Sequence, residues 1–123
     1  MSLNTLCWAD VPVKNLDRAI AFYTAVLGSA VSKEGDGGFT FGLLPHSEQN
    51  ASGCLVETED NEPSQKGPLV YLSVEGRMDS AVAEVERNKG KVVSPKHAIG
   101  PHGFRAIIID SEGNKIALHS HAG

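Results

Sequence analysis

The stretch Asn15-Leu-Asp-Arg-Ala-Ile-Ala-Phe-Tyr-Thr-Ala-Val-Leu-Gly28 decides the fold class, because it predicts one amphipathic helix together with both of its ends. Asn15 is a typical N-cap residue, and Gly28 stands where helices commonly end on a left-handed glycine. Between them the apolar residues recur three and four positions apart, the spacing of one buried helix face: Leu16, Ala19, Ile20, Tyr23, Val26 and Leu27. The sequence therefore predicts a helix that packs on another layer through that face.

Segments on both sides of this helix have the pattern of strands. Residues 6–13 alternate before the helix, and short strands are predicted after it at 30–32, 39–44 and 53–58. The polar residues 60–68, which include two prolines and a glycine, are typical of a linker.

The second half of the chain repeats this order of elements. A strand at 69–74 precedes a helix that begins near Met78 and is predicted to end at Gly90, and strands follow at 91–93, 104–109 and 115–119, with a tight turn at 110–113. An offset of 62 residues aligns Asp17 with Asp79 and Gly28 with Gly90. We therefore predict an α+β fold of two βαβββ modules, about residues 3–59 and 69–121, that form an open curved mixed sheet around a cleft within a single domain, 1–123.

Composition excludes several classes of function. The 123 residues carry a net charge of −4, so we expect neither a nucleic acid nor an anionic membrane as the main partner. The most apolar run, 19–27, is far shorter than the ~20 residues of a membrane span, and the first residues do not resemble a signal peptide. Two cysteines without metal-site spacing fit reduced thiols. The expected location is the cytoplasm.

Two motifs resemble one known family. Val11-Pro-Val, Asp17-Arg-Ala, Phe22-Tyr23 and Val26-Leu-Gly28 are similar to the opening of the glyoxalase/bleomycin-resistance/extradiol-dioxygenase (vicinal oxygen chelate) superfamily, and the segment from Asp110 to Leu118 resembles its last hairpin. The resemblance is greatest to short single-domain members related to lactoylglutathione lyase. It implies paired βαβββ modules around a cleft, and usually a homodimer. It also implies a divalent metal ion held by His, Gln or Glu side chains, one from each of four strands.

This chain departs from the family at the metal positions. Alignment to the family motifs puts the four ligands at Trp8, Glu57, Leu69 and Ala117. Tryptophan, leucine and alanine offer no lone pair to a metal, so we expect the standard metal site to be absent and no cofactor to be bound. Pro12 stands where relatives that use glutathione often carry a basic residue, which argues against glutathione chemistry.

Strand alternation predicts which side chains face the cleft. The predicted cleft residues are Leu6, Trp8, Asp10, Pro12, Leu55, Glu57, Leu69, Tyr71, Ser73, Ala117, His119 and His121. The opposite, helix-facing set is apolar: Cys7, Val11, Val13, Cys54, Val56, Val70, Leu72, Val74, Ile116 and Leu118. Both cysteines are thus expected to be buried.

The predicted cleft has aromatic and polar residues that suit a small aromatic or cationic molecule. Trp8 and Tyr71 would form its floor, and Asp10, Glu57 and His119 would supply polar groups. Glu57, in an apolar cleft, would be a general base. The alternatives are that Trp8 fills the space of a lost metal, that Glu57 is solvated or ion-paired, and that Asp10 lies in water at a strand end.

The histidines and Arg105 allow further hypotheses. His97 and His102 flank a Gly/Pro loop that could cover the cleft, so His102 is either a ligand contact or an exposed turn residue. His119 and His121 lie on one strand face and, with Glu57, would make a relocated iron-type metal site. We expect His46 to be exposed. Arg105 either pairs with a carboxylate or a substrate anion or, as we expect, is an ordinary surface residue.

The sequence is therefore compatible with three functions. The first is a metal-free glyoxalase-like protein that binds a small organic ligand through Trp8, Asp10, Tyr71, His102 and His119, with Glu57 as the catalytic base if it is an enzyme. The second is a metal-dependent lyase, isomerase or dioxygenase that uses Glu57, His119 and His121. The third is a dimeric interaction scaffold with a filled cleft. The sequence does not decide between enzyme and binding protein.

Overall fold

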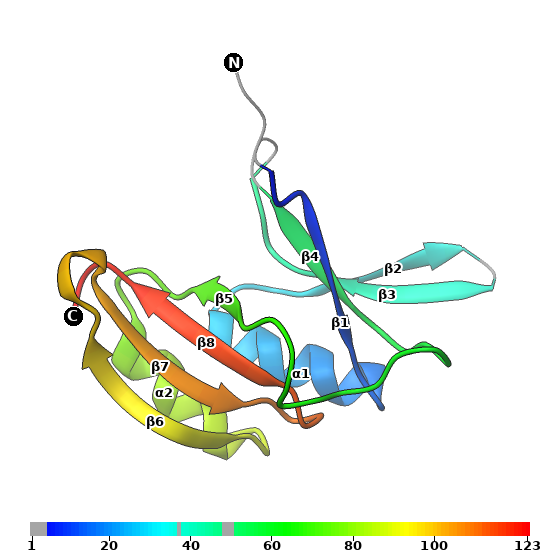
Figure 1. The fold of residues 1–123 in the computed structure, drawn as a ribbon. Helices are drawn as coiled ribbons and strands as arrows, with labels where there is room; N and C mark the ends of the chain where they lie inside the picture. The colour runs from blue at the N-terminus through cyan, green and yellow to red at the C-terminus, as the bar shows by residue number, and fades with distance from the viewer. Residues whose placement is uncertain (1–4, 37, 48–50) are drawn as a thin grey trace.

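Two four-stranded sheets and two helices form the molecule, as the computed structural model of residues 5–36, 38–47 and 51–123 describes it (Figure 1). In chain order the elements are β1 (Trp8–Pro12), α1 (Leu16–Leu27), β2 (Ser32–Asp36), β3 (Phe39–Leu43), β4 (Ser52–Val56), β5 (Val70–Ser73), α2 (Met78–Arg87), β6 (Lys91–Ala98), the 3-10 turn η1 (Gly100–His102), β7 (Phe104–Ile109) and β8 (Lys115–Ser120).

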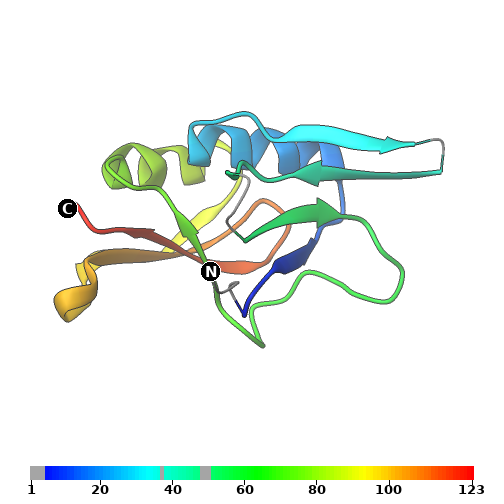
Figure 2. The same ribbon diagram turned by 90° about the horizontal axis from the view of Figure 1, so that it is seen from above.

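The two sheets have the same strand order, which confirms the internal repeat. The first runs β1-β4-β3-β2 and the second β5-β8-β7-β6. In each, the first and last strands of the module pair in parallel, and the other neighbours are antiparallel. Both helices lie on the same side of the strands (Figure 2). The α+β fold of two βαβββ modules is therefore confirmed.

Strand β6 is longer than the sequence pattern predicts. The prediction ends at residue 93, whereas β6 continues to Ala98 through Pro95. Because β6 is the last strand of its sheet, a residue without a backbone N–H can be accommodated there. Strand β2 is likewise an edge strand, and it begins at Ser32 rather than residue 30.

The helix ends follow the prediction in α1 but not in α2. Asn15 accepts a hydrogen bond from the Arg18 backbone N–H at 3.0 Å, and Gly28 closes α1 in the left-handed conformation at φ 71°. At the end of α2, Lys89 takes the left-handed conformation instead of Gly90. A Cβ at Gly90 would lie 2.6 Å from a ring carbon of Phe22. Gly90 is therefore needed for close packing and not for a helix cap.

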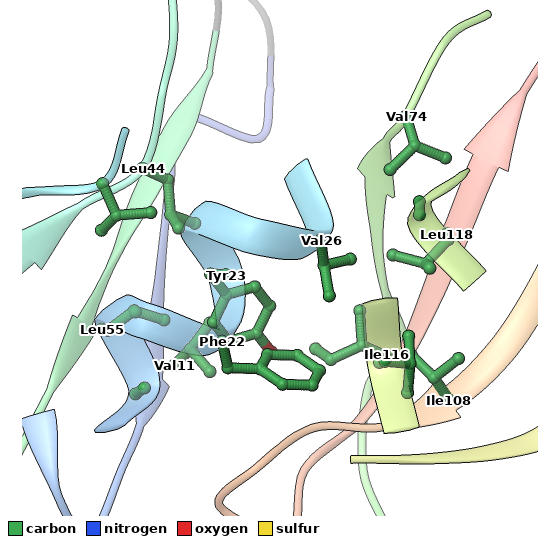
Figure 3. Close-up of a cluster of buried hydrophobic side chains, with 14 of the residues drawn as sticks. Val11, Phe22, Tyr23, Val26, Leu44, Leu55, Val74, Ile108, Ile116 and Leu118 are labelled. Carbon is green, nitrogen blue, oxygen red and sulfur yellow. The ribbon is translucent and has the colours of Figure 1, made fainter. Parts of the chain in front are cut away.

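A single hydrophobic core joins the two modules. Phe22, Tyr23 and Val26 of α1 lie between side chains of the first sheet, such as Leu55, and those of the second, such as Leu118 (Figure 3). All five are fully or almost fully buried. Burying an apolar side chain of this size contributes about 2 kcal/mol, so the core couples the modules strongly.

Buried hydrogen bonds reinforce this coupling at the predicted turn between β7 and β8. Asp110 accepts from three backbone N–H groups of the turn, each at 2.9 Å, and from the Tyr23 hydroxyl of α1 at 2.5 Å. Burial and the neighbouring Asp110 raise the pKa of Tyr23 well above its usual value, so the hydroxyl stays a donor. Two residues later, Glu112 pairs with Arg18 at 2.7 Å. The turn of module two is thus fixed to the helix of module one.

Candidate functional site

The sheet face of module two that points away from the helices carries the richest set of polar side chains. In the strand register Tyr71 pairs with Ala117, and His119 pairs with both Ser73 and Arg105. The alternating residues Leu72 and Leu118 contact the helix-side core. Paired residues of neighbouring strands share a face, so Tyr71, Arg105 and His119 point the other way, as predicted for the two on β5 and β8.

These three side chains line an open hollow that we call the Tyr71 hollow. Ile99 and His102, from the loop around η1, complete its lining, and its volume is ≈ 540 Å³. The loop that the sequence suggests as a cover for the cleft therefore borders this hollow, and His102 lies in it. Tyr71, His102 and His119 are three of the five ligand residues predicted from the sequence.

Arg105 is the cationic centre of this hollow. Its Nε donates to His97 Nε2 at 3.0 Å, and a terminal nitrogen donates to the Tyr71 hydroxyl. His97 in turn donates from Nδ1 to the Pro95 carbonyl at 2.9 Å, which leaves its Nε2 as the acceptor. Among the residues that the structure describes, no carboxylate forms an ion pair with Arg105. The guanidinium is therefore held in place while its charge stays unneutralised.

His119 connects the strand to the loop. Its Nε2 lies 2.7 Å from the His102 carbonyl oxygen. A carbonyl only accepts, so this ring nitrogen carries the hydrogen and Nδ1 is the free acceptor. The ring of His121 lies edge-on at 4.9 Å from the ring of His119.

Trp8 and Asp10, the other two predicted ligand residues, form a separate cluster in module one. Trp8 Nε1 donates to Asp10 Oδ1 at 3.0 Å, and the thiol of Cys54 approaches the same oxygen at 3.4 Å. Burial, followed by the hydrogen bond to Asp10, raises the pKa of Cys54 to about 11. Neither Trp8 nor Asp10 lines the Tyr71 hollow. The structure therefore does not bring the five predicted residues into one site.

The predicted place of Glu57 in the cleft is wrong. Its side chain is exposed, and its Oε2 accepts the Leu16 backbone N–H at 2.8 Å, so it caps the start of α1. The underlying error is the orientation of β4: Leu55 pairs with Val11 and lies in the core, whereas Cys54 pairs with Asp10 on the opposite face. Residues 54–56 are all apolar and all buried, so alternation gave no reliable signal there.

The two cysteines also differ from each other. Cys54 is buried, as predicted, but Cys7 is exposed, which contradicts the prediction for that residue. Cys7 precedes β1, and within the described residues the pairing of β1 with β4 begins only at Trp8.

Three residues that the structure brings to this region were not among the predicted site residues. Arg105 was expected to be an ordinary surface residue, but its register opposite His119 places it in the hollow. His97 holds the arginine, and Glu75 lies beside His121, with 3.2 Å between the carboxylate and the ring nitrogen. The only sequence signal for Arg105 is its place in the alternation of β7, between Phe104 and the buried Ala106.

A second cavity lies between the two modules, and its lining includes Leu6, Tyr71 and Ser73 of the predicted cleft residues. It has a volume of ≈ 390 Å³ and is bordered by β1 and β5, with Leu6, Val11, Val70 and Leu72 among its mostly apolar lining. Strands β1 and β5 are each the end strand of a sheet. The two sheets therefore remain separate along this line.

The model of the Glyoxalase/Bleomycin resistance protein/Dioxygenase superfamily matches residues 5–118. The chain belongs to this superfamily. No match was found among curated proteins.

Solved structures of superfamily proteins have the same fold. A glyoxalase/bleomycin resistance protein from Albidiferax ferrireducens superposes with a TM-score of 0.75 at 17% identity, covering 95% of this chain and 98% of the other. An enzyme of the glyoxalase/bleomycin resistance protein/dioxygenase family from Burkholderia phytofirmans gives 0.71 at 15% identity, with 95% and 98% covered. A glyoxalase I mutant from Zea mays gives 0.71 at 20% identity, but this chain, covered to 94%, spans only 46% of it.

The residues at the superfamily's expected metal positions do not fit a metal ion. Ala117 is fully buried and has no donor atom, and Leu69 and the indole N–H of Trp8 cannot coordinate a metal. Glu57, the remaining position, points to the first turn of α1. These four residues therefore do not form a ligand set.

Neither helix of the described residues is long and apolar enough to cross a membrane.

Proposed function

We propose that this chain is a glyoxalase-like binding protein that has lost the superfamily's standard metal site and holds a small organic anion in the Tyr71 hollow. The unneutralised charge of Arg105 carries the proposal. A guanidinium that is fixed by His97 and Tyr71 but lacks a carboxylate partner is suited to bind a carboxylate or phosphate through paired hydrogen bonds.

The rest of the hollow supports an anion with an aromatic portion. Tyr71 is 45% exposed, so a ligand can reach its ring. The apolar Ile99 and the ring of His102 lie in the loop at its border. The sequence favoured an aromatic or cationic ligand that contacts Trp8 and Asp10. We propose an anion instead, because Trp8 and Asp10 are hydrogen bonded to each other outside the hollow.

The test compares three probes with the same ring and different charge: benzoate, benzamide and benzylammonium. We expect benzoate to bind and raise the melting temperature, and the other two to bind at least about tenfold more weakly. Binding would be measured by calorimetry on the tag-free protein.

Two variants make the test specific. Arg105→Gln is expected to weaken benzoate binding by at least about tenfold. Arg87→Gln is the matched control, since Arg87 is an exposed arginine on α2 that pairs only loosely with Glu84, at 3.8 Å. Tighter binding of benzylammonium, no binding of benzoate, or equal effects of the two variants would each refute the proposal. The homodimer, the cytoplasmic location and any catalytic turnover stay predictions.

A further inference from the structure

The end of β8 brings together three side chains that no standard position of the superfamily includes. Glu75, in the turn after β5, lies beside His119 and His121, and one ligand atom from each of the three lies within 4.8 Å of the others. We call these residues the Glu75 group. The parallel pairing of β5 with β8, with Ser73 opposite His119, produces this arrangement.

Glu75 is held in a fixed orientation as a carboxylate. Its oxygens accept the backbone N–H groups of His121 at 2.7 Å and Ala122 at 3.0 Å, and the Ser120 hydroxyl at 3.2 Å. The second lone pair of Oε1 faces His121 Nδ1 at 3.2 Å, so an ion bound by both groups would replace this contact and leave the backbone bonds in place.

His119 is oriented in the way that metal-binding histidines usually are. Such histidines donate one ring N–H to a carbonyl or carboxylate and coordinate through the other nitrogen. His119 donates from Nε2 to the His102 carbonyl at 2.7 Å, and this bond leaves the lone pair of Nδ1 free. This orientation of the His119 ring is an observation independent of the short distances within the Glu75 group, and it supports metal binding.

We propose that Glu75, His119 and His121 bind a divalent transition-metal ion, with Zn²⁺ as the reference ion. Two imidazoles and one carboxylate are a ligand set for zinc and for non-haem iron, whereas Mg²⁺ prefers oxygen ligands alone. Three protein ligands leave a coordination position open. This site is independent of the anion proposed above, although His119 borders both.

The proposed site shares His119 and His121 with the relocated metal site suggested by the sequence, but its carboxylate is a different residue. Glu57 was the expected carboxylate, but it caps α1. Glu75, which follows β5, lies beside the two histidines instead.

The experiment is a Zn²⁺ titration of tag-free, chelator-treated protein against a competing chromophoric chelator. We expect one Zn²⁺ per chain in the wild type and at least about tenfold weaker binding in His121→Ala, His119→Gln and Glu75→Gln. His121→Ala is the safest variant for folding, because Glu75 bonds to the backbone N–H of residue 121 and not only to its ring. His46→Ala removes an exposed histidine elsewhere and is the matched control.

A second measurement identifies the coordinating atom. Histidine ¹⁵N spectra should show the Nε2–H tautomer of His119 before metal is added, and a shift of Nδ1 upon Zn²⁺ binding. No uptake of Zn²⁺ at concentrations near that of the protein would overturn the proposal. So would equal losses in His121→Ala and His46→Ala, or a shift confined to histidines outside the group.

Discussion

In module one the carboxylates of Asp10 and Glu57 accept hydrogen bonds from neighbouring groups, whereas in module two the guanidinium of Arg105 keeps an unpaired charge. Asp10 accepts from both Trp8 and Cys54, and Glu57 caps α1. Arg105, by contrast, has no carboxylate partner in the described part of the chain. The two modules thus have the same strand order, but the side chains on their strands differ in their hydrogen bonds and charges.

The modules also differ in how their helices begin. The first turn of α1 is capped by the Asn15 side chain, and Glu57 accepts the Leu16 N–H. At the start of α2, by contrast, the N-cap residue Arg77 makes no capping hydrogen bond with its side chain to any residue that the structure describes. Glu57 therefore stabilises α1 and is not available to a ligand. The residues to test for ligand binding are those of module two.

The largest effect is expected from Asp110, which fixes module two to α1. Asp110→Ala would leave buried N–H groups and the Tyr23 hydroxyl without an acceptor, at a cost of about 3–5 kcal/mol in the free energy of unfolding. Urea denaturation would measure it. Asp17→Ala is the control, since Asp17 forms only an exposed pair with Lys33, and should cost less than about 1 kcal/mol. Similar losses in both variants would contradict the coupling of the modules.

A smaller effect, dependent on pH, is expected from Glu112. Burial alone would raise its pKa, but hydrogen bonds from Arg18 and from the backbone N–H groups of Asn15 and Lys14 lower it to about 2, against 4.5 in the unfolded chain. The unfolded state therefore takes up the proton first as the pH falls. The stabilisation is complete above pH 4.5 and is lost between 4.5 and 2, amounting to at most about 3 kcal/mol.

Denaturation of the wild type and Glu112→Gln at several pH values would measure this difference. The gap between their free energies of unfolding should be widest near neutral pH and should narrow steadily below pH 4.5. A gap that does not change with pH would mean that the ionised Glu112 does not stabilise the interface with α1.

The smallest effect is expected at Glu57. Glu57→Gln should lower stability by less than about 1 kcal/mol, because one exposed contact to a helix N-terminus is weakened, and should leave benzoate binding unchanged. Asn15→Ala, which removes the other cap of α1, should cost about 1 kcal/mol and serves as the stability reference. Loss of benzoate binding in Glu57→Gln would restore Glu57 to the site and remove the contrast between the modules.

Much of the fold could be predicted from the sequence because it depends on local signals. The apolar spacing of residues 16–27, with Asn15 and Gly28 at its ends, determines α1, and the same order of elements after residue 69 indicates the second module. On β5 and β8 alternation is clear, so Tyr71 and His119 were assigned to the correct face.

Only the tertiary structure decided the site, because the site depends on strand register and on contacts between distant residues. The apolar run 54–56 has no alternation that would orient β4, so Glu57 was wrongly placed in the cleft. The pairing of β7 with β8 brings Arg105 opposite His119, and the pairing of β5 with β8 brings Glu75 to His121. These residues are far apart in the chain and are brought together by the register of the strands. The pattern of apolar and polar residues within one strand does not determine which residue of another strand lies opposite.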